Sequence, residues 1–449
     1  MMKRILCLAL AMVMLCGAAM ADASKVTVTW DADLEGAKTF WAAASGDEGS
    51  TLENMAKALA ELMEGLRVEL IAQDNGGYLA LYMKDTLVLD LGLESDWDYS
   101  RFFSSLWAEH YLSATISQED AARSQESWEK LNAIDPEALG ADMAYELVRW
   151  LDELPVKQSQ GDFSGDAFEG AKLLYSYEFN DQSVARLVER LLTVAEDHGI
   201  TDELLAGYLG ENANVYENIC RKNQEVAEAN RFSYELQVAC GPQKEYMGGT
   251  LLVLESGQQV MSLSHGLFQD GWQLVWGYGL NGANYYVDLE VVSLQETPGT
   301  QVGLFFVRDD QRLGFTNMEW NEESLLFMFT GAFLPQTDGK WGTIAEIMML
   351  DQQLDWYVVE GIRHEADNTA EYAVHWYQGE VTETPLQTIR IAVEPCEPMV
   401  WDADNMTPID AEADGSDELL TQLVEENTKE MLLNLFRLVP TQLLTMLLM

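Results

Sequence analysis

The sequence predicts an α+β fold. Helices cover a large curled antiparallel β-meander of about ten strands, and a smaller α+β unit precedes this meander. The first observation is a period of two: Phe232, Tyr234, Leu236 and Val238 alternate with mostly polar residues, as in a strand with one buried face. The second is that similar apolar runs recur, between turn residues, as far as residue 398. The third is helical periodicity on both sides of these runs. So many strands favour strong curling, a sandwich or a barrel.

The apolar runs of the meander have the length of strands and end at residues that favour turns. Asn281-Gly282 and Asp338-Gly339 supply positive φ angles, and Pro298-Gly299 presets a turn. After the first strand, the expected strands cover residues 249–254, 272–280, 285–294, 302–307, 325–334, 342–350, 354–360 and 388–393. This spacing predicts antiparallel neighbours joined by short connections.

The chain before the meander predicts a smaller unit of strands and helices. Ser50 and Glu53 form a capping-box pattern at the start of an amphipathic helix. The segment Asp74-Asn75-Gly76-Gly77 is a strong hairpin signal. The strands expected around these features cover residues 25–30, 67–72, 78–83 and 86–91.

Helices are expected between this unit and the meander. Ser117 and Asp135, which is followed by Pro136, are typical of helix N-termini. After them, residues 156–166 are polar, rich in Gly and Ser, and without periodicity, so they predict a linker. A strand at 172–179 then leads to a helix that Asn180 or Asp181 caps, and a more polar helical stretch covers 202–229.

An amphipathic helix is expected at the C-terminal end, with its apolar stripe packed on the sheet. The predicted organisation is a signal peptide at 1–21, an N-terminal α+β domain at 22–155, a linker at 156–166, helices plus the meander at 167–398, an acidic loop at 399–415 and the C-terminal helix at 416–449.

The first 21 residues have the pattern of a targeting segment. Lys3 and Arg4 precede an apolar run at 5–15, which is too short to span a bilayer, and Ala19-Met20-Ala21 fits a cleavage site. A secreted or extracytoplasmic protein is therefore expected, with cleavage after Ala21. A lipid anchor on Cys16 is disfavoured, because Leu15 stands where the lipoprotein motif has a small residue.

The formal charge of the chain is −49, and loss of Lys3 and Arg4 with the signal would make it −51. Such a surface repels nucleic acid and anionic membranes, so neither is an expected partner. Polar residues interrupt the apolar C-terminal stretch, which disfavours a transmembrane span in the mature chain. The expected partners are an apolar or amphiphilic small molecule or another extracellular protein.

Three cysteines follow the predicted cleavage site, namely Cys220, Cys240 and Cys396. An odd number at such wide spacing is neither a disulfide framework nor a zinc site. A bridge between Cys240 and Cys396 stays open, and Cys220, in a helical stretch, is expected to be a small buried hydrophobe.

Two motifs of catalytic appearance lie inside the meander, where their usual context is missing. Residues 277–282 match G-x-G-x-x-G, but a strand follows where a nucleotide site needs a helix. The segment from Ser262 through Ser264 and His265 to Gly266 resembles a nucleophile elbow, but it lacks the strand-to-helix turn. No catalytic residue and no organic cofactor are therefore predicted.

One acidic run has the oxygen spacing of a calcium loop. Asp410, Glu412 and Asp414 supply positions one, three and five, and Gly415 supplies position six. However, position twelve is Thr421, which cannot act as a bidentate carboxylate. Two interpretations of this run therefore remain: a calcium site, or a solvated acidic linker.

Aromatic residues on one expected strand form the candidate ligand site. Trp272, Trp276 and Tyr278 share a strand face because they lie an even number of residues apart. Such side chains usually fill a core, but an exposed row would suit sugar rings or an apolar ligand.

Three classes of function remain compatible with these features. The first is an exported, non-catalytic protein that binds an apolar or amphiphilic ligand in a cavity between sheet and helices. The second is an extracellular structural or interaction module without a small ligand. The third is a secreted hydrolase, which would need a cleft with converging carboxylates or histidines of shifted pKa.

Overall fold

A computed structural model describes residues 23–31, 34, 37–38, 51–163, 170–209, 214–268, 270–280, 283–294, 299–308, 325–336, 340–350, 354–364, 366–378, 381, 385–411, 413 and 415–438. These residues contain twenty strands and seven α-helices, α3–α9. The strands belong to one sheet, and its recorded pairings are antiparallel except for β20 with β6. The predicted α+β class and long antiparallel meander are confirmed.

The chain forms two compact units, each described by itself. Unit 1 combines Met1–Ile116 with Gly331–Met449, and unit 2 is Ser117–Thr330. Strand β15, Leu325–Pro335, contains the limit between them. Unit 1 therefore includes both ends of the sequence, an arrangement that the order of elements alone does not predict.

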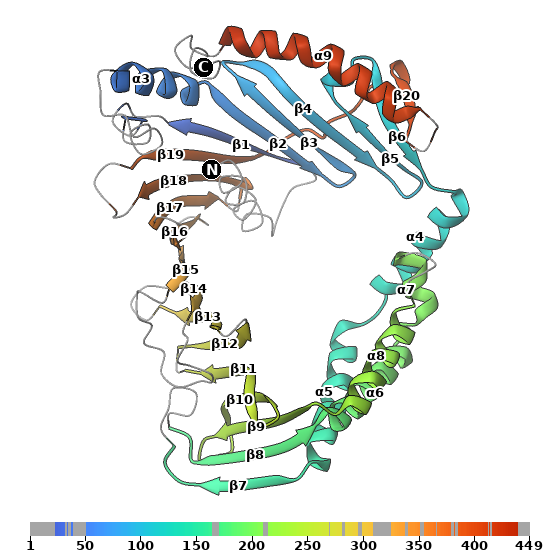
Figure 1. Ribbon diagram of the computed structural model, residues 1–449, viewed down its shortest axis with the longest axis vertical. Coiled ribbons are helices and arrows are strands. Elements are labelled where there is room, and N and C mark those ends of the chain that lie inside the picture. Colours follow the sequence, from blue (N-terminus) through green and yellow to red (C-terminus); the bar gives the residue numbers. More distant parts are fainter. Residues whose placement is uncertain are drawn as a thin grey trace. The chain divides into compact units, whose positions relative to one another are not determined.

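Unit 1 consists mainly of a sheet with two flanking helices (Figure 1). Its strands pair in the order β16–β17–β18–β19–β1–β2–β3–β4–β5–β6–β20. The elements are β1 Ala23–Asp31, α3 Thr51–Glu64, β2 Leu66–Gln73, β3 Gly76–Met83, β4 Thr86–Ser95, β5 Tyr99–Phe103, η1 Ser105–Trp107, β6 His110–Thr115, β16 Lys340–Leu350, β17 Leu354–His364, β18 Thr369–Gln378, β19 Gln387–Pro395, η4 Ala403–Asn405, β20 Thr407–Asp410 and α9 Ser416–Leu438.

The hairpin between β2 and β3 forms where the sequence predicts it. Gln73 pairs with Gly76, so Asp74 and Asn75 alone make the turn. Gly76 has a φ of +152°, and a Cβ at this position would collide with the Leu93 carbonyl of β4. Glycine is therefore required where three strands approach one another closely.

One face of β3–β6 is covered by the C-terminal part of the chain. The ring of Trp401 stacks on Phe103 with 4.4 Å between centroids and fills the space beside Gly92. Helix α9 begins at Ser416, as predicted, and packs against η1 and β4. Its Asn427 Nδ2 donates to the Leu106 carbonyl at 2.8 Å.

Unit 2 consists of a run of antiparallel strands and a group of helices (Figure 1). The strands pair in chain order from β7 to β14. The elements are α4 Gln118–Asn132, α5 Pro136–Glu153, β7 Val156–Gln160, β8 Leu173–Asn180, α6 Asp181–Asp197, α7 Asp202–Leu209, α8 Val215–Ala229, β9 Phe232–Cys240, β10 Tyr246–Glu255, β11 Gln258–Leu267, β12 Gly271–Leu280, β13 Ala283–Ser293 and β14 Thr300–Arg308. Strand β7 lies within the predicted linker.

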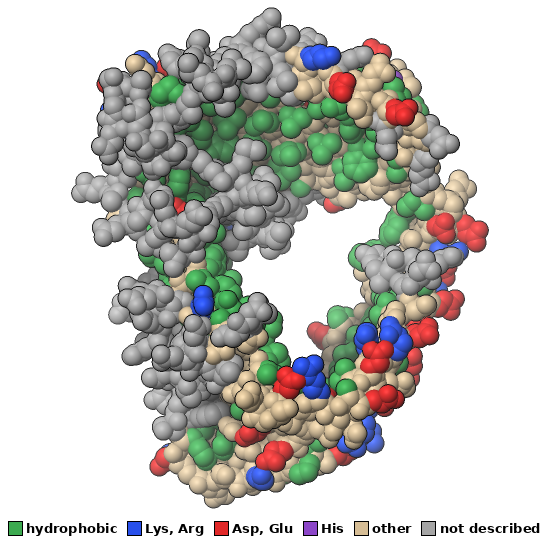
Figure 2. Space-filling model, viewed as in Figure 1, with side chains coloured by type: hydrophobic (Ala, Val, Ile, Leu, Met, Phe, Trp, Pro, Cys, Tyr) green, Lys and Arg blue, Asp and Glu red, His purple; other side chains and the backbone are tan. Residues whose placement is uncertain are grey.

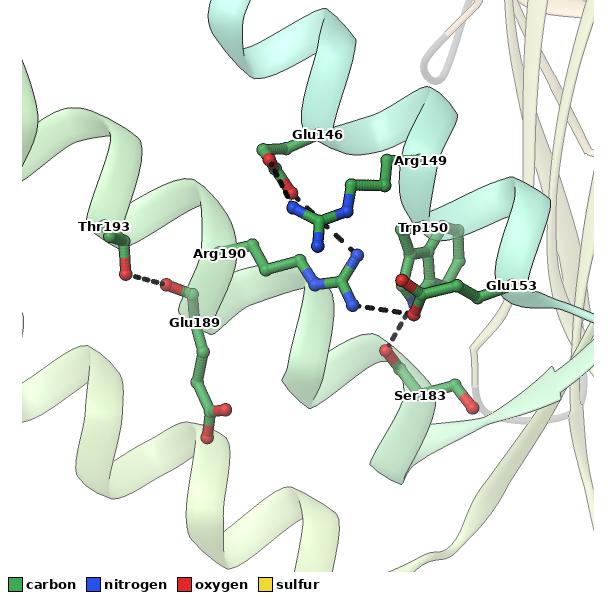
Figure 3. A network of polar contacts seen from close by, with 8 residues as sticks. All are labelled: Glu146, Arg149, Trp150, Glu153, Ser183, Glu189, Arg190 and Thr193. Atoms are coloured by element: carbon green, nitrogen blue, oxygen red, sulfur yellow. Dashed lines mark hydrogen bonds and ion pairs between the residues drawn. The ribbon is translucent and has the colours of Figure 1, made fainter.

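Side-chain contacts hold helices α5 and α6 together and tie α6 to the sheet. Figure 3 shows Arg190 of α6 between Glu153 and Glu146 of α5, with nitrogen–oxygen distances of 2.6 and 3.9 Å. The buried Trp150 donates from Nε1 to the Ser183 carbonyl at 2.8 Å. At the start of α6, the fully buried Asp181 accepts from the Tyr234 hydroxyl at 2.7 Å and from a backbone N–H of β9.

The prediction that the meander is curled is wrong. The described pairings of unit 1 run from β16 to β20, those of unit 2 run from β7 to β14, and neither run returns to its first strand. The edge strands explain why closure is unnecessary. Every residue of β7 is exposed and all but Val156 are polar, and β20 has four residues including Pro408. Short, polar or proline-containing edges resist pairing with other chains.

Candidate functional site

An exposed leucine surface lies on one face of strands β2–β4 in unit 1. The strand register places Leu70 beside Leu79, Leu79 beside Leu91, and Leu81 beside Leu89, so these side chains share a face. The exposed fractions of Leu79, Leu89 and Leu91 are 42%, 42% and 47%. We call this surface the leucine face; it consists of Leu70, Leu79, Leu81, Leu89, Leu91 and Leu93.

The alternation along β4 explains why this face is apolar and yet open. Asp90 and Gly92 project to the opposite face, where the Asp90 carboxylate accepts from the Ser105 N–H at 2.7 Å and Trp401 lies over Gly92. Leu89, Leu91 and Leu93 alternate with these two residues and therefore point away from the covered side. Figure 2 shows hydrophobic side chains gathered over strands β2–β5.

A groove of about 690 Å³ adjoins the leucine face at the hairpin end of β2 and β3. Leu70 and Leu93 of the leucine face line it, and so do Ile71 and Gln73, which alternate with Leu70 along β2 and project from the opposite face. The groove therefore lies at the end of the sheet, next to the leucine face. The described lining residues are Leu70, Ile71, Ala72, Gln73, Asp74, Asn75, Gly76, Gly77, Leu93, Ser95, Asp96 and Trp97.

The walls of the groove are held by hydrogen bonds to the backbone. Gln73 accepts from the Met399 N–H at 2.7 Å and donates to the Met399 carbonyl at 3.2 Å. The Ser95 N–H donates to the Asn75 carbonyl at 2.8 Å, which joins the hairpin to the end of β4. Asp74 and Asp96 are exposed at the rim, and Trp97 beside them is 37% exposed. An apolar floor with an acidic rim suits an amphiphile.

The candidate ligand residues of the sequence lie together in unit 2. Trp272, Trp276 and Tyr278 share one face of β12, as the spacing predicts, and Trp276 is 45% exposed. The Trp276 and Tyr278 rings lie 5.2 Å apart, and Tyr285 and Phe306 extend the contacts at 5.5 and 5.8 Å. We call Trp276, Tyr278, Tyr285 and Phe306 the aromatic row. Trp272 instead contacts the His265 ring at 6.3 Å.

The other face of β12 and β13 carries a buried polar cluster that the sequence pattern does not predict. Gln273 Nε2 lies 2.8 Å from each carboxylate oxygen of Asp288 and 2.9 Å from Glu290 Oε1. Gln273 and Asp288 are fully buried, and burial raises the pKa of the Glu290 carboxyl. Only the strand register, which sets Gln273 opposite Glu290, reveals this cluster.

The candidate calcium loop lies partly outside the described residues. Asp410 is exposed at the end of β20, so a strand and not a helix precedes the loop. Glu412 and Asp414 are not among the described residues. Within the described part of the chain, no group of three or more metal-binding side chains comes together. Calcium binding stays a prediction.

Cysteine and histidine side chains are dispersed in the structure. Cys220, Cys240 and Cys396 are free, and Cys220 is exposed on α8, so the expectation that it is buried is wrong. The Ser264 hydroxyl lies 3.1 Å from that of Thr250, whereas His265, the next residue of β11, projects to the opposite face and lies 3.1 Å from the Tyr246 hydroxyl. Adjacent strand residues cannot form a serine–histidine pair on one face.

In the part of the chain that the structure describes, no helix combines the length and the apolar character that crossing a bilayer requires. A scan against models of known protein families gave no match, and a search of curated proteins gave no significant match either.

Proposed function

We propose that this chain is an exported, non-catalytic protein that binds an apolar or amphiphilic ligand on the leucine face and in its groove. The observation that carries this proposal is a leucine face with three exposed leucines on neighbouring strands, which continues through Leu70 and Leu93 into a groove of about 690 Å³. Contiguous exposed apolar surface is uncommon on soluble monomers and marks interaction sites. Single exposed leucines would carry no such meaning.

The size of the groove favours a small molecule over the protein-interaction alternative. Ligand pockets span roughly 300–1,000 Å³, and the groove falls within this range. A flat protein interface needs no such hollow. A hydrolase would use converging carboxylates in a cleft, whereas Asp288 and Glu290 converge on the buried amide of Gln273.

The predicted signal peptide and the charge of −49 fit this function. An exported protein with an exposed apolar face needs a surface that keeps it soluble, and like charges hinder self-association. The aromatic row offers a second apolar surface, and it contains Trp276 and Tyr278, two of the three ligand-binding residues that the sequence predicts.

The test is calorimetric titration of the chain from residue 22 with neutral alkyl maltosides of increasing chain length, each below its micelle concentration. Each methylene removed from water contributes about 0.8 kcal/mol, so affinity should rise about fourfold per methylene. The double variant Leu79→Gln, Leu91→Gln should bind at least about tenfold more weakly, because it makes the leucine face polar.

The matched control is Leu147→Gln with Leu419→Gln, which changes two leucines that are each 41% exposed on helices. This control should bind as the unchanged chain does. Equal binding by both double variants would refute the leucine face as the site. Loss of binding in Trp276→Ala alone would move the site to the aromatic row.

A further inference from the structure

We infer that the ligand of the leucine face carries a cationic head group, and that the groove selects alkylammonium amphiphiles through Asp74, Asp96 and Trp97. This inference rests on the proposed function and specifies its ligand class. Three features support it: the acidic charge at the rim, the pairing of the nearby basic residues with other carboxylates, and the exposed ring of Trp97 next to Asp96.

The rim of the groove is acidic and lacks a basic side chain. Asp74 stands at the tip of the β2–β3 hairpin and Asp96 in the turn after β4, and both are exposed. The described lining contains no Lys or Arg. Among the described residues, Asp96 accepts a local bond from the Trp97 N–H at 2.8 Å, and one such bond uses a small part of the acceptor capacity of a carboxylate.

The basic side chains of the adjacent strands are paired with other carboxylates. Lys25 contacts Glu394 at 2.7 Å, Arg67 contacts Asp85 at 2.8 Å, and Arg101 contacts Glu94 at 3.4 Å. The negative charge of the rim is therefore not compensated by these side chains. The excess of acidic residues in the whole chain adds to the attraction for cations.

Trp97 completes a surface suited to an ammonium group. It lines the groove directly after Asp96, and 37% of its surface is exposed. Indole faces attract quaternary ammonium groups, and carboxylates add a direct Coulomb attraction. With the alkyl chain on the leucines, the head group of the same molecule lies at the rim. A carboxylate or sulfate head group would be repelled there.

The experiment compares three amphiphiles with a twelve-carbon chain: dodecyltrimethylammonium, dodecyl maltoside and dodecanoate. Each is titrated calorimetrically below its micelle concentration at low and at high NaCl. The cation should bind about tenfold or more tighter than the maltoside, and the anion should bind more weakly than both. Added salt should narrow the gap, because it screens exposed charges.

Asp74→Asn with Asp96→Asn should lower the affinity for the cation to that for the maltoside and leave maltoside binding unchanged. The matched control, Glu61→Gln with Glu64→Gln, removes two exposed charges from α3 and should preserve the preference. Thermal denaturation of each variant verifies folding.

The outcomes separate the inference from the proposed function. If the maltoside binds and the cation binds no tighter, the cationic head group is refuted while the proposed function stands. If Asp74→Asn with Asp96→Asn weakens both ligands equally, the two carboxylates have a structural role and the inference also fails. If none of the three amphiphiles binds, both proposals are overturned.

Discussion

The raised pKa of Glu290 links the stability of unit 2 to pH. Its carboxylate and that of Asp288 meet at one amide group, Gln273 Nε2, which can donate only two hydrogen bonds. Burial raises the pKa of Glu290, because the charged form loses hydration. A group whose pKa is raised by folding stabilises the fold fully below its unfolded pKa, and this contribution is lost as pH rises through the folded pKa.

The variant Glu290→Gln should therefore become more stable relative to the unchanged chain as pH rises from about 4 to about 8. Glutamine imitates the protonated carboxyl and carries no charge that must be buried. The measurement is the urea midpoint of unfolding at several pH values. Glu178→Gln, at an exposed position of β8, serves as control and should show a smaller pH-dependent difference. A constant offset for Glu290→Gln would contradict the prediction.

At the scale of residues, some of the site follows from spacing and some does not. Trp276 and Tyr278 share a face because their separation of two fixes it in any strand. The groove residues Leu70 and Leu93 come from different strands, and only the register brings them together. A shift of one residue would turn all the leucines of β4 to the covered side. Local sequence does not specify that register.

Helix boundaries illustrate how far local signals reach at the scale of elements. The side chain of Asp135 accepts from the N–H groups of Glu137 and Ala138 at 3.0 and 3.3 Å, and Pro136 begins α5 as predicted. Ser117 and Asn180 cap α4 and α6 in the same way. These contacts span two or three residues, so the sequence contains all the information they need.

Asp135→Ala should destabilise the protein by about 1 kcal/mol, because two N–H groups at the start of α5 lose their acceptor. Asp135→Ser should restore most of this loss, since a serine hydroxyl caps equally well. Chemical denaturation with urea measures both differences. If the alanine and serine variants unfold at the same urea concentration, the cap contributes nothing at this helix.

Two of the strands that are missing from the expected set, β7 and β11, have mixed or polar patterns. In β11, Ser262 and Ser264 are buried between apolar residues that face the other side, so the buried face is the polar one. In β7 every residue is exposed, and among the described pairings it is hydrogen-bonded to β8. A period of two with apolar residues inside therefore identifies many strands of this chain but not these two.

At the scale of the whole molecule, the charge of −49 opposes compactness. Raising NaCl from about 10 mM to about 150 mM should increase the melting temperature by a few degrees, because it screens repulsion between carboxylates. Circular dichroism during heating measures the change. Calcium chloride at equal ionic strength should have the same effect if no site binds it. A larger increase that Asp410→Asn abolishes would instead support the predicted calcium loop.

The pairing of β1 with β19 determines when unit 1 can be completed. Ser24 lies opposite Pro395 and Asp31 opposite Thr388. Strand β1 therefore has one neighbour close in sequence, β2, and one far away in sequence, β19. Ribosomes deliver the chain from its N-terminus, and the continuous segment Ser117–Thr330 emerges long before β19. Unit 2 can therefore assemble during synthesis, while β1 keeps one edge open. Closing so long a loop is slow, and the newly made chain stays unfinished until its last strands arrive.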